Sequence, residues 1–339
     1  MALTAPSSES ISGLRVWWFT PDKPDNVSVG RRRIADHLEA MGAQVTLVGT
    51  TPGTVWRAIR EPTTADVFVG TTRAGAVAAT VLGTLTRRPV VIDHVDPIRQ
   101  FATTHPRWLA RVVERLENLS FRLAAATLYV YEEEEGRVRS RSNRATQTDL
   151  GVEVDRFTPT PESRAAGRDL LEEAGVSGQV AVYVGGLEPL YNVEAMLGAA
   201  RHLENWTLVL AGAGSLAPRV RAAAEEDDGI VYLGSLAHDR IPPLLHASDV
   251  GLSLVDDAHT LKVLEYGVAG LPVVQLAGRA EDRFGDRVEY CSRDRAAVAR
   301  AIRRAGSRDG DALRAFARQY DWRRIAETYG AVLASVSQG

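Results

Sequence analysis

The stretch DVGLSLVDDAHTLKVLEYGVAGLPVV, residues 249–274, contains the signals that decide the fold of this chain. Its first seven residues are an apolar run typical of a buried strand, and the polar turn 256–260 follows. Residues 261–270 then have the apolar spacing of a helix, and a second apolar run begins at Leu271. A strand, a helix and a strand in this order predict one unit of a parallel α/β sheet.

The same alternation continues through the whole chain. In the first half, the strand candidates are residues 14–19, 44–50, 65–72, 89–95 and 126–132. In the second half they are residues 179–186, 206–214, 229–235, 249–255, 271–277 and 287–292. These runs are apolar throughout rather than alternating, which indicates strands that are covered on both faces. We therefore expect an α/β fold of two doubly wound, Rossmann-like domains.

A polar, proline-containing stretch near 150–163 interrupts the pattern and is interpreted as the connection between the domains. The expected division is a disordered lead (1–13), a first domain (14–160), a second domain (161–320) and a C-terminal helix (321–339). In such sheets ligands bind outside the carboxyl ends of the strands, so a cleft between the domains is the expected site.

Composition excludes several classes of protein. The net charge of −3 over 339 residues provides no global field that would gather nucleic acid. Cys291 is the only cysteine, which excludes a disulfide framework and a cysteine-rich metal site and fits a reducing cytoplasm. The N-terminal residues do not resemble a signal peptide, and no apolar run approaches the ~20 residues of a membrane-spanning helix. We expect a cytoplasmic protein.

The turn and helix start at 256–265 have the features of an anion site. Thr260 is a plausible N-cap, and the exposed amides of the first helical turn favour a negative charge. Lys262 lies in that turn, and Glu265 lies three residues on, so both can share one face. A cation with amides suits a phosphate, and a carboxylate one turn deeper can accept hydrogen bonds from a ribose. A surface ion pair at a helix start is the alternative.

This segment resembles the donor signature of family 4 retaining glycosyltransferases, which have the two-Rossmann GT-B architecture. Asp257 is followed after seven residues by Glu265 and then by the stretch GVAGLPVV (267–274). The resemblance implies that Asp257 contacts hydroxyls of the donor sugar and that Glu265 contacts the ribose. It further implies that residues 258–261, which include His259, Thr260 and Leu261, offer backbone amides to the diphosphate.

Other stretches extend the resemblance over nearly the whole chain. The sequence GVEVDRFTP (151–159) is similar to the family's linker, and residues 231–255 are similar to the elements before the donor signature. The resemblance implies that the loop from Gly234 to Leu236 lies against the nucleotide base. It also implies that the C-terminal helix crosses back to the first domain. The match is specific in the second domain and loose in the first.

One departure from the family pattern concerns the diphosphate. The family has an arginine shortly after the first strand of the second domain and a Lys-Gly pair a few residues later. Here Gly186, which with Gly185 the resemblance places at the nucleotide, stands where the arginine would be, and Tyr191 and Asn192 replace the Lys-Gly pair. Two expected cations are therefore absent. Three explanations are open. Other cations compensate for the two that are absent, or the enzymatic activity is weak, or the donor is not a nucleoside diphosphate sugar.

In the first domain, Gly30 and His94 are the candidate site residues. The resemblance places Gly30 in a loop near the donor phosphates and acceptor, and His94, at the carboxyl end of a strand, near the donor sugar. The alternative for His94 is a histidine whose hydrogen bonds are satisfied within its own loop. The arginines 31–33 follow Gly30, and one of them could supply the missing charge. A solvated basic turn is the other interpretation.

Two further stretches are ambiguous. The segment 106–122 predicts a basic amphipathic helix, which either lies against an anionic membrane or packs its apolar stripe on the first sheet. The acidic run 132–136 is expected to be a solvated turn, and no ligand spacing predicts a metal site or a cofactor.

The resemblance thus implies a retaining glycosyltransferase of glycan biosynthesis that moves a sugar from a nucleotide-diphosphate donor to a hydroxyl of a glycan or a lipid-linked acceptor. It would be cytoplasmic, at the inner face of the membrane if the helix 106–122 binds there. The second domain would bind the donor and the first the acceptor. One alternative is a weak or inactive relative that binds a nucleotide sugar or a partner protein. The other is an epimerase of the same architecture.

Overall fold

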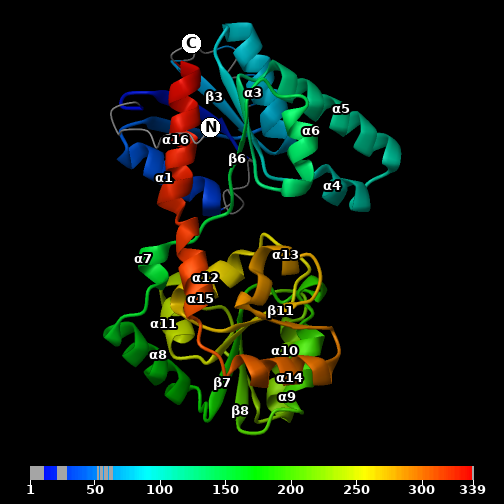
Figure 1. Cartoon of the computed structure of the whole chain (residues 1–339), viewed down its shortest axis with the longest axis vertical. Helices are drawn as coiled ribbons and strands as arrows, with labels where there is room; N and C mark the ends of the chain where they lie inside the picture. Colours follow the sequence, from blue (N-terminus) through cyan, green and yellow to red (C-terminus); the bar gives the residue numbers. More distant parts are fainter. Residues whose placement is uncertain are drawn as a thin grey trace. The chain divides into compact units, whose positions relative to one another are not determined.

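The computed structural model describes residues 11–20, 29–51 and 64–337, together with residues 53, 56 and 60. The chain divides into two compact units, each with its own parallel sheet (Figure 1). The first unit comprises residues 1–150 and 322–339, and the second comprises residues 151–321.

The first unit contains a six-stranded parallel sheet with the order β2-β1-β3-β4-β5-β6. Its strands are β1 (Arg15–Phe19), β2 (Gln44–Val48), β3 (Val67–Thr71), β4 (Val90–His94), β5 (Ala126–Tyr129) and β6 (Ala145–Gln147). The chain passes from β1 to β2 and then returns to β3 on the other side of β1, as in doubly wound folds. The two central strands β3 and β4 are buried along their whole length, as their apolar sequences predict.

Helices cover this sheet. They are α1 (Val29–Ala40), α3 (Thr72–Thr86), α4 (Ile98–Thr104), α5 (Arg107–Leu123), the 3₁₀ turn η2 (Glu132–Glu134), α6 (Glu135–Arg139) and the C-terminal α16 (Trp322–Ser337). Helix α16 returns from the second unit to pack on α1, as predicted (Figure 1). The ring of Tyr329 stacks on Trp18 of β1, with ring centroids 5.6 Å apart.

The second unit contains a six-stranded parallel sheet with the order β12-β11-β10-β7-β8-β9. Its strands are β7 (Gln179–Val184), β8 (Trp206–Ala211), β9 (Ile230–Tyr232), β10 (Val250–Ser253), β11 (Val273–Leu276) and β12 (Glu289–Cys291). The chain proceeds outward from β7 to β9 and then returns to β10 on the other side of β7. The point between β7 and β10 is therefore the topological switch point, where such sheets bind ligands.

The longer helices of the second unit lie over this sheet. They are α7 (Val154–Phe157), α8 (Pro161–Glu173), α9 (Val193–Ala200), α10 (Ala217–Glu226), α11 (Ile241–His246), α12 (Leu261–Ala269), α13 (Glu281–Phe284), α14 (Arg295–Ala305) and α15 (Asp311–Ala317). The shorter 3₁₀ turns are η3 (Pro189–Tyr191), η4 (His238–Arg240), η5 (Gly285–Arg287) and η6 (Arg318–Tyr320). Two apolar clusters, one on each face of the sheet, form the core.

Two boundaries differ from those expected from the sequence. The stretch 151–160 packs with the second unit rather than the first, because Val152 N donates to Tyr320 O at 2.8 Å and Phe157 is buried in the second core. Residues 11–13, expected in the disordered lead, are ordered, because Ile11 is buried and Gly13 N donates to Gly42 O. The rest of that lead, residues 1–10, lies outside the described residues.

Candidate functional site

The loops at the switch point of the second sheet bring together most of the predicted site. Residues 185–192 follow β7 and residues 254–260 follow β10, the two strands that flank this point. The side chain of Asn192 joins the two loops, because its amide donates to Leu254 O at 2.7 Å. Asn192 adopts a left-handed conformation (φ 53°), which asparagine tolerates better than most residues.

The turn before α12 is held by the side chains that the sequence singled out. Asp257 Oδ1 accepts a hydrogen bond from His259 N at 2.9 Å, which closes the turn two residues on. Thr260 occupies the N-cap position, as expected, but its side chain makes no capping hydrogen bond. His259 Nδ1 lies 2.6 Å from a terminal nitrogen of Arg283 and accepts from it, since a guanidinium can only donate. Arg283 therefore lies beside this turn, although no pattern in the sequence indicates it.

Lys262 lies in the first turn of α12, and aromatic rings surround its ammonium. Nζ is 4.3 Å from the ring centroid of Tyr191 and 5.6 Å from that of Tyr183. Burial lowers the pKa of Lys262. Among the described residues, no carboxylate lies within ion-pair distance of this ammonium. Ring faces thus hold the cation, and its charge is available to an anionic ligand.

Gly185 makes this position of the lysine possible. A Cβ on residue 185 would lie 2.3 Å from Lys262 Cε, and the φ of +149° is also unfavourable for other residues. Tyr183 donates its hydroxyl hydrogen to Gly186 O at 2.6 Å, which fixes the ring beneath the loop. Glycine fits at positions 185 and 186 because Lys262, Tyr183 and Tyr191 pack against this loop. The family resemblance does not predict this packing.

Glu265 lies one turn further along α12 and is half-buried. Burial raises its pKa to about 7, and the charges of Lys262 and Arg156 offset this effect only in part. No described residue donates a hydrogen bond to the carboxylate. A half-buried carboxylate without donors is costly for a fold, and such groups concentrate at functional sites.

The loops after β7, β8 and β9 are connected through their backbones. Gly185 N donates to Ala211 O at 2.9 Å, and Gly212 N donates to Gly234 O at 2.8 Å. Residue 212 must be glycine, because a Cβ there would lie 1.9 Å from Gly185 O. Gly234 and the half-buried Leu236 therefore lie at the same edge of the sheet as Gly185.

The other two predicted site residues lie in the first unit. His94 ends β4 and is buried, with Nε2 3.1 Å from Glu134 Oε2 and its ring edge-on to Phe121. Burial by itself would raise the pKa of Glu134, but hydrogen bonds from His94 and Arg137 lower it to about 2. The expectation of a solvated acidic turn is wrong for Glu134, because these partners from β4 and α6 neutralise it.

Gly30 lies in the first turn of α1, against the indole of Trp322, and a Cβ there would lie 2.6 Å from a ring carbon. The next residue, Arg31, is buried and donates to both oxygens of Asp93 at 2.9 and 3.0 Å. Tyr329 of α16 donates to the same carboxylate at 2.6 Å. The charge of Arg31 thus compensates Asp93 inside the first unit, and it is not the missing phosphate cation.

The described residues contain no cluster of His, Cys, Asp and Glu side chains that could hold a metal ion. None of the helices among them is long and apolar enough to cross a membrane.

Known proteins identify the class to which this fold and site belong. Residues 178–307, most of the second unit, match the family model described as "Glycosyl transferases group 1". The protein is a glycosyltransferase. More particularly, its second unit is a group 1 glycosyltransferase domain. No curated protein sequence matches the chain.

Solved structures show the same two-Rossmann GT-B architecture. HepE of Anabaena, crystallised with UDP, is similar at a TM-score of 0.75 and 17% identity, covering 95% of this chain and 100% of its own. Sucrose-phosphate synthase of Thermosynechococcus elongatus is similar at a TM-score of 0.71 and 15% identity, and the match covers 94% of this chain and 97% of the synthase. A glycosyltransferase of Rickettsia africae is similar at a TM-score of 0.73 and 11% identity, and the match covers 96% of this chain and 98% of that protein. At these identities the likeness shows the fold.

Proposed function

We propose that the protein transfers a sugar from a nucleoside diphosphate sugar to a hydroxyl acceptor, with retention of the anomeric configuration. One observation carries the donor part of this proposal. Lys262 and Glu265 lie one turn apart at the switch point, and no described residue supplies an ion-pair partner to the first or a hydrogen bond to the second. A ligand with both phosphate and hydroxyl groups would satisfy both side chains.

Each residue of the site has a role in this proposal. The amides at the start of α12 and the ammonium of Lys262 bind the diphosphate and stabilise the charge that it gains as a leaving group. Glu265 accepts hydrogen bonds from two ribose hydroxyls. Asp257 keeps Oδ2 for a hydroxyl of the sugar, since Oδ1 already accepts from the backbone. HepE has been crystallised with UDP-glucose as well as UDP, which supports a uridine diphosphate donor.

The missing arginine and lysine leave Lys262 as the main cation of the second unit's site. Loss of one well-placed donor to a developing charge costs roughly 10² to 10³ in rate. Arg283 is another cation of this unit, and it contacts the donor turn through His259. We therefore propose that Arg283 takes over part of the charge stabilisation.

The acceptor part of the proposal concerns the first unit. We propose that this unit binds a glycan or a lipid-linked acceptor, with Gly30 and His94 at the donor phosphates and sugar as the family resemblance implies. The roles of these two residues and a cytoplasmic location stay predictions.

The test is nucleotide binding followed by turnover. Thermal-shift measurements with nucleoside diphosphates are expected to select one base, and ligand at 100 times its Kd adds about 2.7 kcal/mol of stability. Donors of that base, labelled in the sugar, are then offered with and without acceptors. Binding without transfer or hydrolysis of any donor would indicate the inactive relative. Release of an epimerised sugar without an acceptor would indicate the epimerase.

Matched variants test the site itself. Lys262→Ala and Glu265→Ala are each expected to weaken nucleotide binding at least tenfold, from the loss of a charged hydrogen-bond partner of about 1.5–3 kcal/mol. Glu172→Ala, at an exposed position of α8, is the control. Unchanged nucleotide affinity in both site variants, with an intact fold, would refute the proposed donor site.

A further inference from the structure

Helix α5 has its apolar side facing outward. Trp108, Val112, Leu116, Leu119 and Leu123 form one stripe along the helix, and each is between 43% and 67% exposed. The buried residues of the helix are Ala110, Glu117, Ser120 and Phe121, of which Phe121 alone is large and apolar. An ordinary surface helix has the opposite arrangement. The interpretation that this helix packs its apolar stripe on the sheet is therefore wrong.

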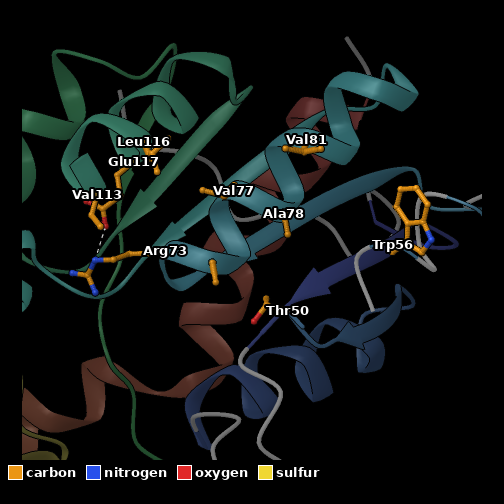
Figure 2. A pocket seen from close by; sticks show the side chains of 10 residues that line it. Thr50, Trp56, Arg73, Val77, Ala78, Val81, Val113, Leu116 and Glu117 are labelled. Atoms are coloured by element: carbon orange, nitrogen blue, oxygen red, sulfur yellow. Dashed lines mark ion pairs between the residues drawn. The ribbon is translucent and has the colours of Figure 1, made fainter. Parts of the chain in front are cut away.

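Ion pairs, rather than a large apolar contact, hold α5 against the first unit. Glu117 is buried, with its oxygens 3.0 Å from Arg73 Nε and 2.7 Å from a terminal nitrogen of Arg137 (the Arg73 pair is drawn in Figure 2). Phe121 adds one buried ring. The outward stripe thus contributes little to the packing of α5, so the fold does not explain why it is apolar.

The neighbouring helix α3 widens the apolar surface. Its side chains Val77 and Val81 are exposed and line a groove of about 560 Å³ with Leu116 of α5 and Trp56 (Figure 2). Leu85, 64% exposed, continues the same helix. Large contiguous apolar surfaces are rare on monomers and mark contacts with membranes or other proteins.

Charge decides which partner fits this surface. Exposed arginines repeat along α5 beside the apolar stripe: Arg107, Arg111, Arg115 and Arg122. Both glutamates of the helix, Glu114 and Glu117, are half-buried or buried, so α5 has no exposed carboxylate. The net charge of the chain is −3, so this basic stripe is a local feature. It complements an anionic surface.

The geometry points to a flat anionic partner. The stripe from Trp108 to Leu123 is about 22 Å long at 1.5 Å per residue. Tryptophan at its beginning suits the interface between headgroups and acyl chains. A second copy of the chain, paired through the same surface about a two-fold axis, would bring two basic stripes together and repel.

We propose that the exposed faces of α5 and α3 dock on an anionic lipid bilayer. The side chains of the stripe enter the boundary between headgroups and acyl chains, and the arginines contact lipid phosphates. This inference goes beyond the proposed function, and its test needs neither nucleotide nor acceptor.

The experiment is sedimentation of the full chain with vesicles of phosphatidylcholine, with and without phosphatidylglycerol. We expect binding to the anionic vesicles only, weakened by added salt. Trp108→Ser with Leu116→Ser is expected to reduce the partition coefficient more than tenfold. Arg111→Gln with Arg115→Gln is expected to reduce it roughly 25-fold, at about fivefold for each arginine near the surface.

The matched control is Arg201→Gln with Arg300→Gln, which removes the same charge from exposed positions of the second unit. It is expected to bind vesicles as the unchanged protein does. Absence of binding to anionic vesicles, or an equal loss in the control, would overturn the proposal. So would a dimer, seen by analytical ultracentrifugation, that the Trp108→Ser and Leu116→Ser variant dissociates, since a second copy would then occupy this surface.

Discussion

Replacing Glu265 by glutamine is expected to stabilise the second unit and to weaken its binding of nucleotide. The carboxylate is half-buried, no described residue hydrogen-bonds to it, and burial raises its pKa from 4.5 to about 7. The folded protein therefore binds a proton between these pH values that the unfolded chain releases. The resulting stability is complete below pH 4.5 and is lost as the pH rises through 7.

The size of the effect follows from these two values. At 1.36 kcal/mol for each pKa unit, the full displacement corresponds to about 3 kcal/mol of unfolding free energy above pH 7. Glutamine does not ionise and does not incur this loss. The stabilisation of Glu265→Gln relative to the unchanged protein should thus be about 2 kcal/mol greater at pH 8 than at pH 5.5.

Urea unfolding of the full chain at the two pH values measures this difference, and Glu172→Gln is the control for removing an exposed carboxylate. Calorimetry at pH 8 should show the opposite effect on binding, about 10- to 100-fold weaker for the nucleotide, because a charged acceptor of two hydroxyl hydrogen bonds is lost. A stability difference that does not change with pH, or an undiminished affinity, would refute this reasoning.

Three further substitutions test other parts of the structure. Tyr191→Leu removes one of the two rings that hold the lysine ammonium and should weaken nucleotide binding about fivefold by calorimetry, whereas Tyr191→Phe should not. Gly30→Ala forces a Cβ against Trp322 and should destabilise the fold by about 1–3 kcal/mol in urea unfolding. Asp93→Asn leaves the buried guanidinium of Arg31 uncompensated and should cost about 3–5 kcal/mol, seen as a lower Tm.

For each of these substitutions, one outcome would contradict the prediction. Equal binding by the leucine and phenylalanine variants of Tyr191 would show that the ring face does not position the cation. Gly136→Ala is the control for Gly30→Ala, because a Cβ at residue 136 meets nothing within 4 Å. Equal stability of the two alanine variants would contradict the contact with Trp322. A Tm of Asp93→Asn close to that of the unchanged protein would show that the ion pair contributes little.

The strands of both sheets could be predicted from the sequence, because a strand buried on both faces must be apolar along its length. Among the described strands, β6 is the one that no apolar run indicates, because it is a three-residue, polar strand at the edge of its sheet. The boundary near residue 150 could not be placed, because the contact between Val152 and Tyr320 joins residues far apart in the chain.

The site could be predicted only where its residues are neighbours in the sequence. Lys262 and Glu265 share one helix, and helical spacing places them on one face. The contribution of Tyr183, which depends on the position of β7 beside β10, has no local signal. Spacing also predicts that α5 is amphipathic, but the same pattern results whether the apolar side faces the core or the solvent.

The central claim is that Lys262 and Glu265 together hold the nucleoside diphosphate of the donor. A crystal structure of the chain with UDP, the nucleotide seen in HepE, tests it most directly. We predict a phosphate oxygen within hydrogen-bond distance of Lys262 Nζ and both ribose hydroxyls on the carboxylate of Glu265. A nucleotide bound away from the switch point between β7 and β10, with both side chains unoccupied, would contradict the account.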